Sequence, residues 1–349
     1  MKEELLLYGA TGYTGKLIIE ALLAQKIKPV LAGRNDAALR LLGEKYSLDT
    51  ITFTLDDPHA IKPHLENIKV VLNAAGPFIY TYANMLKACL ETGTHYLDIT
   101  GEYQVFEGCA AKNEEAINAK IMVLPGAGFD VVPSDCLAAN LKERLPDALF
   151  LNLAFVSVNS TISRGTAKTA LENIGNGAII RKDGILKKIT PGSDTRYINF
   201  GSLQAYATVI SWGDISTAYY STKIPNIKVY NVLPEKLIKK MRLLNLFSWL
   251  LQLRPIKNYL IKKIDERKAG PDYEQRQNGF CLLWGCLENK AGQRVEMRLR
   301  TPEAYLLTSL TAAIIAKKVL SNQYKVGFQT PSTAYGKDLI LEIQDCKFI

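Results

Sequence analysis

The stretch LLLYGATGYTGKLIIEALL, residues 5–23, places three glycines between a strand-like apolar run and a helix-like run. Gly9 would permit a tight turn, and Gly12 would let the backbone approach a diphosphate. Gly15 would let the helix pack closely on the sheet, with the first N–H groups of the helix facing the phosphates. The GxxGxxG spacing differs from the GxGxxG of the plain dinucleotide fingerprint. The pattern predicts a nucleotide-binding loop, and a purely structural glycine turn is the alternative.

This loop opens a regular alternation of strand-like and helix-like segments over the first 125 residues. Short continuous apolar runs separated by helices are typical of a parallel sheet that is buried on both faces. The alternation predicts strands at 5–8, 29–32, 50–54, 70–73, 96–99 and 121–124, and helices at 15–25, 36–46, 82–92 and 104–119. We therefore expect an α/β fold with a Rossmann doubly wound parallel sheet, whose ligand binds beyond the carboxyl ends of the strands.

The end of the second predicted strand, PVLAGRN (29–35), indicates which dinucleotide binds. A site for NAD usually places an Asp or Glu about 20 residues after the glycines, where it holds the ribose 2′-hydroxyl. No acid stands at the end of this strand, and Arg34 stands there instead. A guanidinium can pair with a 2′-phosphate, so the sequence favours NADP(H) as the cofactor. An exposed surface arginine is the alternative.

The loops after the fourth, fifth and sixth predicted strands should border the nicotinamide, and they carry the catalytic candidates. Tyr80, Asp98 and Asp130 stand in these loops. Hydride transfer needs a proton donor or a polarising group beside the reacting carbon. Packing or loop capping is the alternative role for each of the three, so the sequence leaves the proton donor open.

Composition excludes several classes of function. The net charge of the 349 residues is +9, but residues 235–264 alone contribute +7, so the basicity is local and does not indicate nucleic-acid binding. Six scattered cysteines without a CxxC pair, and no visible signal peptide, predict reduced thiols in a cytoplasmic protein. The three histidines have no partner at metal-ligand spacing, so we expect no metal site.

Residues 235–264 combine a strongly apolar centre with lysine-rich ends. On a helix, the polar residues of the centre fall within about 120° of one another, and the rest of the circumference is apolar and includes Trp249. A wide apolar face flanked by cations is typical of a helix lying in a membrane interface, which predicts peripheral membrane contact. A helix pair buried in its own domain, or a homodimer interface, is the alternative.

From about residue 131 the rhythm changes, which predicts a second domain. Strand-like runs at 149–158 and 226–233, with a hairpin formed by 280–288 and 294–300, indicate a mixed sheet that could wall a substrate cleft. Helices are expected over 163–177 and over 301–320, the latter with Pro302 in its first turn. We thus expect a Rossmann domain at 1–130, to which 301–349 return, and an α/β substrate domain at 131–300.

The chain resembles the saccharopine dehydrogenase-like oxidoreductases, in the branch that includes the trans-acting enoyl reductases. The motifs that carry the resemblance are GATGYTG (9–15), AGR (32–34), NAAGPF (73–78), HYLDITGE (95–102), GFDVVPSD (128–135) and GFQTPSTAYG (327–336). The resemblance implies that the cofactor is contacted by Gly9, Thr11, Gly12, Tyr13, Thr14, Gly15 and Arg34, with Ala75, Gly76 and Pro77 near it.

The sequence is compatible with three functions. The first is an NADP(H)-dependent oxidoreductase that reduces a lipid-like or otherwise apolar enoyl or carbonyl substrate. The second is a non-catalytic NADP(H)-binding protein that attaches to a membrane or a partner through 235–264. The third is an amino-acid enzyme of the saccharopine type, which would require several cations to hold a dicarboxylate substrate.

Overall fold

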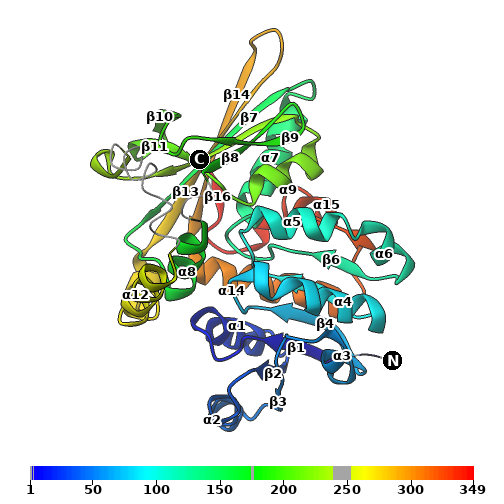
Figure 1. The fold of residues 1–349 in the computed structure, drawn as a ribbon. Coiled ribbons are helices and arrows are strands. Elements are labelled where there is room, and N and C mark those ends of the chain that lie inside the picture. The colour runs from blue at the N-terminus through cyan, green and yellow to red at the C-terminus, as the bar shows by residue number, and fades with distance from the viewer. Residues whose placement is uncertain (1, 3, 174–176, 239–252) are drawn as a thin grey trace. The chain divides into compact units, whose positions relative to one another are not determined.

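The computed structural model describes the chain except at residues 1, 3, 174–176 and 239–252 (Figure 1). The chain divides into two compact units. Unit 1 comprises Met1–Val132 and Tyr305–Gly336, and unit 2 comprises Pro133–Ala304 and Lys337–Ile349. The expectation that all of 301–349 returns to the first domain is wrong for the tail, because Lys347 and Phe348 pair with a strand of unit 2.

Unit 1 contains the predicted Rossmann sheet (Figure 1). Its seven strands in the described part of the chain are all parallel, in the order β15-β6-β5-β4-β1-β2-β3. The winding direction reverses between β1 and β4, which is where such sheets bind their ligands. The strands are β1 (Glu4–Tyr8), β2 (Val30–Gly33), β3 (Thr50–Thr52), β4 (Ile68–Asn73), β5 (His95–Asp98), β6 (Met122–Leu124) and β15 (Gly327–Phe328).

The helices of this part of the chain follow the predicted alternation with one correction. They are α1 (Tyr13–Ala24), α2 (Asp36–Tyr46), α3 (Pro58–Ile61), η1 (Lys62–Leu65), η2 (Phe78–Tyr80), α4 (Tyr82–Thr92), α5 (Tyr103–Ala110), α6 (Asn113–Asn118), α14 (Ala304–Leu320) and α15 (Pro331–Tyr335). The single helix predicted over 104–119 is wrong, because it is divided into α5 and α6. Asn113, the first residue of α6, accepts a hydrogen bond from the Phe328 N–H in β15 at 2.9 Å, a long-range contact absent from the local pattern.

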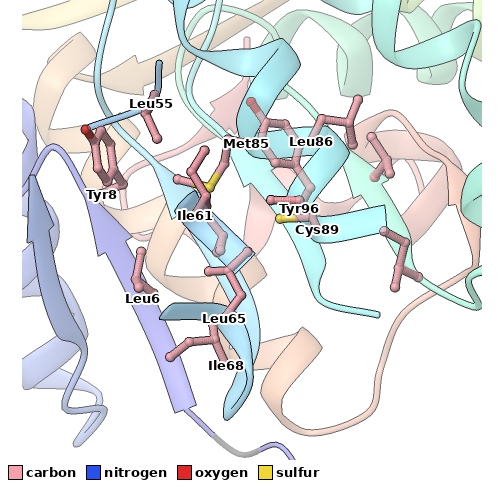
Figure 2. Packing of buried hydrophobic residues seen from close by; sticks show 14 of the residues in the cluster. Leu6, Tyr8, Leu55, Ile61, Leu65, Ile68, Met85, Leu86, Cys89 and Tyr96 are labelled. Carbon is pink, nitrogen blue, oxygen red and sulfur yellow. The ribbon is translucent and has the colours of Figure 1, made fainter. Parts of the chain in front are cut away.

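The core of unit 1 explains why its strands are continuously apolar. One large cluster joins side chains of β1, β4 and β5 to those of η1 and α4, and Figure 2 shows its centre. Leu6, Leu65 and Tyr96 are fully buried there. Burying one such side chain contributes roughly 1.5–3 kcal/mol, so this sheet is held mainly by packing on its covered faces.

Unit 2 contains the predicted mixed sheet. Within the described residues the main path of this sheet runs β10-β11-β12-β7-β13-β14-β16, with β8 and β9 attached beside β12. β12 and β7 are parallel, whereas the predicted hairpin β13–β14 is antiparallel and is confirmed. The strands are β7 (Phe150–Val158), β8 (Ala178–Lys182), β9 (Ile185–Ile189), β10 (Thr195–Asn199), β11 (Gln204–Ile210), β12 (Asn226–Val232), β13 (Phe280–Glu288), β14 (Arg294–Pro302) and β16 (Lys347–Phe348).

The predicted role of Pro302 in the first turn of a helix is wrong. Strand β14 continues through Pro302, which pairs with Phe280 of β13, and α14 begins only at Ala304. The other helices whose bounds lie within the described residues from 132 onward are α7 (Val132–Arg144), α8 (Arg164–Asn173), α9 (Asp214–Thr222), α12 (Arg254–Asp265), α13 (Tyr273–Asn278) and η3 (Leu339–Glu342).

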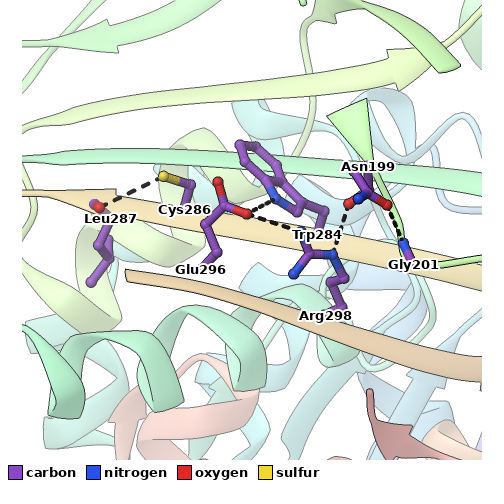
Figure 3. A network of polar contacts seen from close by, with 7 residues as sticks. All are labelled: Asn199, Gly201, Trp284, Cys286, Leu287, Glu296 and Arg298. Carbon is purple, nitrogen blue, oxygen red and sulfur yellow. Dashed lines mark hydrogen bonds and ion pairs between the residues drawn. The ribbon is translucent and has the colours of Figure 1, made fainter. Parts of the chain in front are cut away.

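A polar network joins β13 and β14 to the end of β10 (Figure 3). The buried Trp284 donates its indole N–H to Oε2 of Glu296 at 3.1 Å. Arg298 donates to the same oxygen at 3.0 Å and, through Nε, to the Asn199 carbonyl at 2.8 Å. One carboxylate thus satisfies the buried indole and orients the guanidinium that reaches β10.

The basic segment 235–264 is described only at its ends. Its apolar centre, including Trp249, lies among residues 239–252, outside the described residues. In α12, Leu260, Ile261 and Ile264 pack on Ala167 and Leu171 of α8, so this apolar side belongs to the interior of unit 2. Among the helices described, none has both the length and the apolar character needed to cross a membrane.

Candidate functional site

The carboxyl ends of the parallel strands bring five loops to one edge of unit 1. The loops follow β1, β2, β4, β5 and β6, and every site residue that the sequence predicts lies in one of them, in the first turn of α1, in η2 or at the last residue of β5. Because β1 lies beside β4, the glycine loop after β1 is next to the loop after β4. The candidate site is this edge.

The three glycines of the first loop meet different surroundings. Gly9 has a φ of +83°, and a Cβ there would lie 2.8 Å from the Ala75 nitrogen, so this turn excludes any side chain. A Cβ on Gly15 would overlap the Gly9 carbonyl oxygen, which accounts for the close packing of α1. Within the part of the chain that the structure describes, a Cβ on Gly12 would meet only that oxygen, at 3.2 Å. Gly12 is therefore the position where a ligand could approach the backbone.

The start of α1 is suited to an anion. Gly12 occupies the N-cap position and has no side chain to accept from the first turn, whose N–H groups have no acceptor inside the helix. No acidic residue stands in that turn. The Tyr13 ring packs edge-on against Tyr305 of α14, with the ring centroids 5.3 Å apart. The N–H groups and the partial positive charge of the helix end could hold a diphosphate, while α14 steadies the loop through this ring contact.

Arg34 follows β2 as an exposed side chain. The acid nearest to it in the sequence, Asp36, is already engaged, because it binds Nε of Arg40 at 2.8 Å and accepts from the Thr52 hydroxyl at 2.9 Å. Among the described residues, Arg34 has no ion-pair partner, and its charge remains available to an anionic ligand.

The loop after β4 is held by its own polar side chains. Asn73 accepts from the Ala75 N–H at 3.0 Å and donates to the Thr81 hydroxyl oxygen at 3.2 Å. Thr81 in turn donates to the Ala75 carbonyl at 2.7 Å. These bonds fix the backbone that carries Gly76 and Pro77, which are joined by a cis peptide bond. Sequence reasoning missed Asn73 and Thr81, although both are polar residues at the ends of buried segments.

Asp98 is fully buried and its carboxylate is occupied by internal donors. Oδ1 accepts from the N–H groups of Thr100 at 2.9 Å and Gly126 at 2.8 Å, and Oδ2 accepts from the Tyr96 hydroxyl at 2.8 Å. Burial raises the pKa of Asp98 to about 6. The hydrogen bonds act in the opposite direction, because they favour the charged form. The geometry favours the loop-capping alternative for Asp98, which ties the loops after β5 and β6 together.

Glu102, which the sequence places at this edge without a role, connects two of the loops. Its carboxylate accepts from the Phe78 N–H at 2.7 Å and the Ile79 N–H at 3.0 Å. It therefore holds the first residues of η2, directly after Pro77. An acid one residue before the helix α5 was the signal available in the sequence.

The other two catalytic candidates differ in exposure. Asp130 is half-buried against Gly101, where a Cβ would lie 2.6 Å from its Oδ2. Burial, with a smaller effect of the Glu102 charge, raises the pKa of Asp130 to about 7. Tyr80 ends η2 with 64% of its side chain exposed. The same edge thus carries one acid that can hold a proton near neutral pH and one accessible phenol.

Helix α14 braces the last loop from within unit 1. The Thr308 hydroxyl accepts from the Phe129 N–H at 3.0 Å, and the Thr311 hydroxyl donates to the Ala127 carbonyl at 2.8 Å. The apolar stripe of this helix was visible in the sequence, but these two hydroxyl contacts were not. They hold the backbone immediately before Asp130.

Comparison with known proteins agrees with this geometry. Residues 5–124 match the family model described as the saccharopine dehydrogenase NADP binding domain. A saccharopine dehydrogenase-like oxidoreductase from Mus musculus is 27% identical in an alignment of 203 positions, which covers 51% of this chain and 47% of that protein. The trans-acting enoyl reductase of Mycobacterium leprae (strain TN) is 34% identical in an alignment of 152 positions, which covers 41% of this chain and 36% of the relative.

A solved structure resembles the chain over nearly its whole length. Apo histidine-tagged saccharopine dehydrogenase (L-Glu forming) from Saccharomyces cerevisiae has a TM-score of 0.68 and 14% identity, covering 99% of this chain and 100% of that one. At this identity the likeness concerns the fold alone. The chain spans about half the length, or less, of the curated relatives it matches. The resemblance expected from the motifs is confirmed: the first domain matches the saccharopine dehydrogenase NADP binding domain, and the chain is similar to saccharopine dehydrogenase-like oxidoreductases.

Proposed function

We propose that this protein is an NADP(H)-dependent oxidoreductase whose substrate is an apolar, lipid-like enoyl or carbonyl compound. The observation that carries the proposal is the pairing, at one sheet edge, of an open backbone at Gly12 with an arginine, Arg34, that has no acidic partner among the described residues. The first feature suits a diphosphate, and the second suits the 2′-phosphate that distinguishes NADP(H) from NAD(H).

Each loop would have a separate task in this reaction. The first turn of α1 would bind the diphosphate, and Ala75, Gly76 and Pro77 would border the nicotinamide ribose. Glu102 would keep that loop in place through its two backbone hydrogen bonds. When bound, the cofactor supplies or accepts the hydride. Asp130 and Tyr80 are the candidate proton donors, because one has a pKa near neutrality and the other is exposed.

The proposed substrate class follows from the similarity to one relative. The relative from Mycobacterium leprae bears the name trans-acting enoyl reductase and matches 41% of this chain, which favours an enoyl group. The proposed location is the cytoplasm, with membrane contact through 235–264; a homodimer interface at that segment is the alternative. The proposed function involves no nucleic-acid partner and no resident metal.

A binding and turnover experiment on the full chain tests this function. Calorimetry should detect NADPH binding at least tenfold tighter than NADH binding. Loss of NADPH absorbance should then follow the addition of a long-chain 2-enoyl thioester or a long-chain ketone. Tight NADPH binding without oxidation across this panel would favour the non-catalytic alternative. Turnover only with an amino acid and a keto acid together would favour the saccharopine-type alternative, and no binding of either nucleotide would overturn all three.

A further inference from the structure

A second pocket of unit 1 lies at the opposite edge of the sheet, at the amino ends of β4 and β5. It has a volume of about 620 Å³, within the range of small-molecule sites. Lys69 and His95 stand at or next to the first residues of these two strands. The polar residues that line the pocket are Lys2, Lys69, His95, Lys120, Asn322 and Tyr324.

Three of these lining residues are lysines, and none of the described lining residues is an acid. Lys2 donates to the carbonyls of Leu65 at 3.0 Å and Thr92 at 2.6 Å, and to the Thr94 hydroxyl oxygen at 2.9 Å. These acceptors are uncharged, so they hold the ammonium in place and offset only part of its charge. Lys2 thereby adds a fixed positive charge to the pocket wall.

Lys69 and Lys120 retain donors that could bind a ligand. Lys69 donates to the Leu320 carbonyl at 2.8 Å and to Oδ1 of Asn322 at 2.9 Å. An ammonium has three N–H donors, so one remains on Lys69. Lys120 is exposed, and among the described residues it has no ion-pair partner. The pocket therefore has positive charge and N–H groups without a matching acceptor.

The floor of the pocket contains a buried histidine with a second donor. His95 is only 5% exposed, and its Nδ1 accepts from the Met122 N–H at 2.9 Å. This bond places the proton of the neutral ring on Nε2, for which the described residues provide no acceptor. Burial first, and then the charges of Lys69 and Lys2, lower the pKa of His95 to about 4, in keeping with a positive field at this position. The ring also packs on Tyr324, with centroids 4.1 Å apart.

We propose that this amino-edge pocket binds a small phosphate monoester. The phosphate oxygens would accept from Lys69, Lys120 and Nε2 of His95. A phosphate group is favoured because several cations and N–H donors converge and none of the described lining residues is a carboxylate that would compete for them. The pocket is larger than a phosphate needs, and Tyr324 and Leu320 supply apolar wall for an organic part. The site goes beyond the proposed function, because it lies at the edge of the sheet opposite the glycine loop.

Calorimetry with inorganic phosphate and with glycerol 3-phosphate on the full chain tests this site. Both should bind, and Lys120→Met should weaken binding at least tenfold. Lys69→Met should weaken it further, although the loss of two hydrogen bonds can also lower its thermal stability. Lys120→Met removes no hydrogen bond between described residues, so it keeps the test independent of folding.

The matched control is Lys87→Met, which removes the same charge from an exposed position on α4 outside the pocket. It should change phosphate affinity less than twofold. Equal weakening by the control and the pocket variants would show a nonspecific charge effect and overturn the proposal, as would no phosphate binding. Saturation with NADPH should leave phosphate affinity unchanged. If NADPH displaced the phosphate and Lys120→Met left phosphate affinity unchanged, the phosphate would be bound at the cofactor edge. This result would also overturn the proposal.

Discussion

The carboxylate of Glu102 accepts the backbone N–H of Phe78 at 2.7 Å, and so joins the loop after β5 to the loop after β4. The second oxygen accepts from Ile79 at 3.0 Å. A buried carboxylate that accepts from backbone N–H groups forms strong, charge-assisted hydrogen bonds. The loop beside the proposed ribose position is therefore held by an acid from the neighbouring loop after β5.

Replacement of Glu102 by Gln should loosen this junction. The amide has only one acceptor oxygen, so either Phe78 or Ile79 would face an NH₂ group instead of an oxygen. We expect a loss of about 1–3 kcal/mol in the free energy of unfolding, measured by urea denaturation at pH 7. Glu44→Gln, at an exposed position of α2, is the control and should change it by less than about 0.5 kcal/mol. Equal effects of the two substitutions would contradict the role of Glu102.

The raised pKa of Asp98 predicts a specific pH dependence of stability. In the folded chain the pKa of Asp98 is about 6, above its ordinary value of 3.8, so the folded state binds the proton more tightly. The resulting stabilisation is complete below about pH 4 and is lost as the pH rises through 6, a change on the order of 2–3 kcal/mol. Asp98→Asn removes this titration while its amide oxygen can still accept from Thr100 and Gly126.

The measurement is the unfolding free energy of both proteins between pH 4 and pH 8. Wild type should lose stability relative to Asp98→Asn as the pH rises. The titration of Asp130, whose pKa is raised to about 7, is present in both proteins and largely cancels in the difference. A constant difference across this range would show that Asp98 has the same pKa in the folded and unfolded chains. Asp49→Asn, at an exposed position, serves as the control.

Substitution of Arg34 by Ala should weaken NADPH far more than NADH. Loss of a charge-assisted pair with the 2′-phosphate would cost about 1.5–3 kcal/mol of binding free energy, roughly 10- to 150-fold in affinity. NADH has no such phosphate and should lose little. The control is Arg40→Ala, because Arg40 is already paired with Asp36. The affinities of both cofactors are measured by calorimetric titration. Equal weakening of NADPH and NADH binding by Arg34→Ala would contradict the role assigned to Arg34.

Two alanine substitutions in the glycine loop should separate folding from binding. Gly9→Ala should destabilise the fold by at least about 2 kcal/mol, because φ is +83° and the new Cβ would press on the Ala75 nitrogen. Gly12→Ala should fold almost normally, since its φ of −68° suits any residue, but should bind NADPH at least tenfold more weakly. Thermal unfolding and calorimetry measure the two effects. Unchanged NADPH affinity in Gly12→Ala would contradict backbone contact at Gly12.

The local sequence pattern was sufficient to predict most strands of the first sheet and the helices between them. The predicted helices at 36–46 and 82–92 coincide with α2 and α4, because their apolar spacing and their end residues agree. Prediction from the local pattern failed where a contact with a residue distant in the sequence determines the secondary structure. The hydrogen bond from Phe328 to Asn113 accompanies the division of the helix predicted over 104–119, and pairing with Phe280 keeps Pro302 in a strand. Strands β8 to β11 were missed, because their side chains pack against other strands of unit 2 and carry no simple alternation.

The sequence by itself determined the first six strands of the first domain in their chain order, the glycine loop and the position of Arg34, because these depend on neighbours in the chain. The tertiary structure decided what each polar group at the sheet edge is bonded to. Asp98 and Glu102 stand four residues apart and look equivalent in the sequence. Yet one caps Gly126 and the other holds Phe78, since hydrogen-bond partners are chosen by proximity in the folded chain and not by spacing along it.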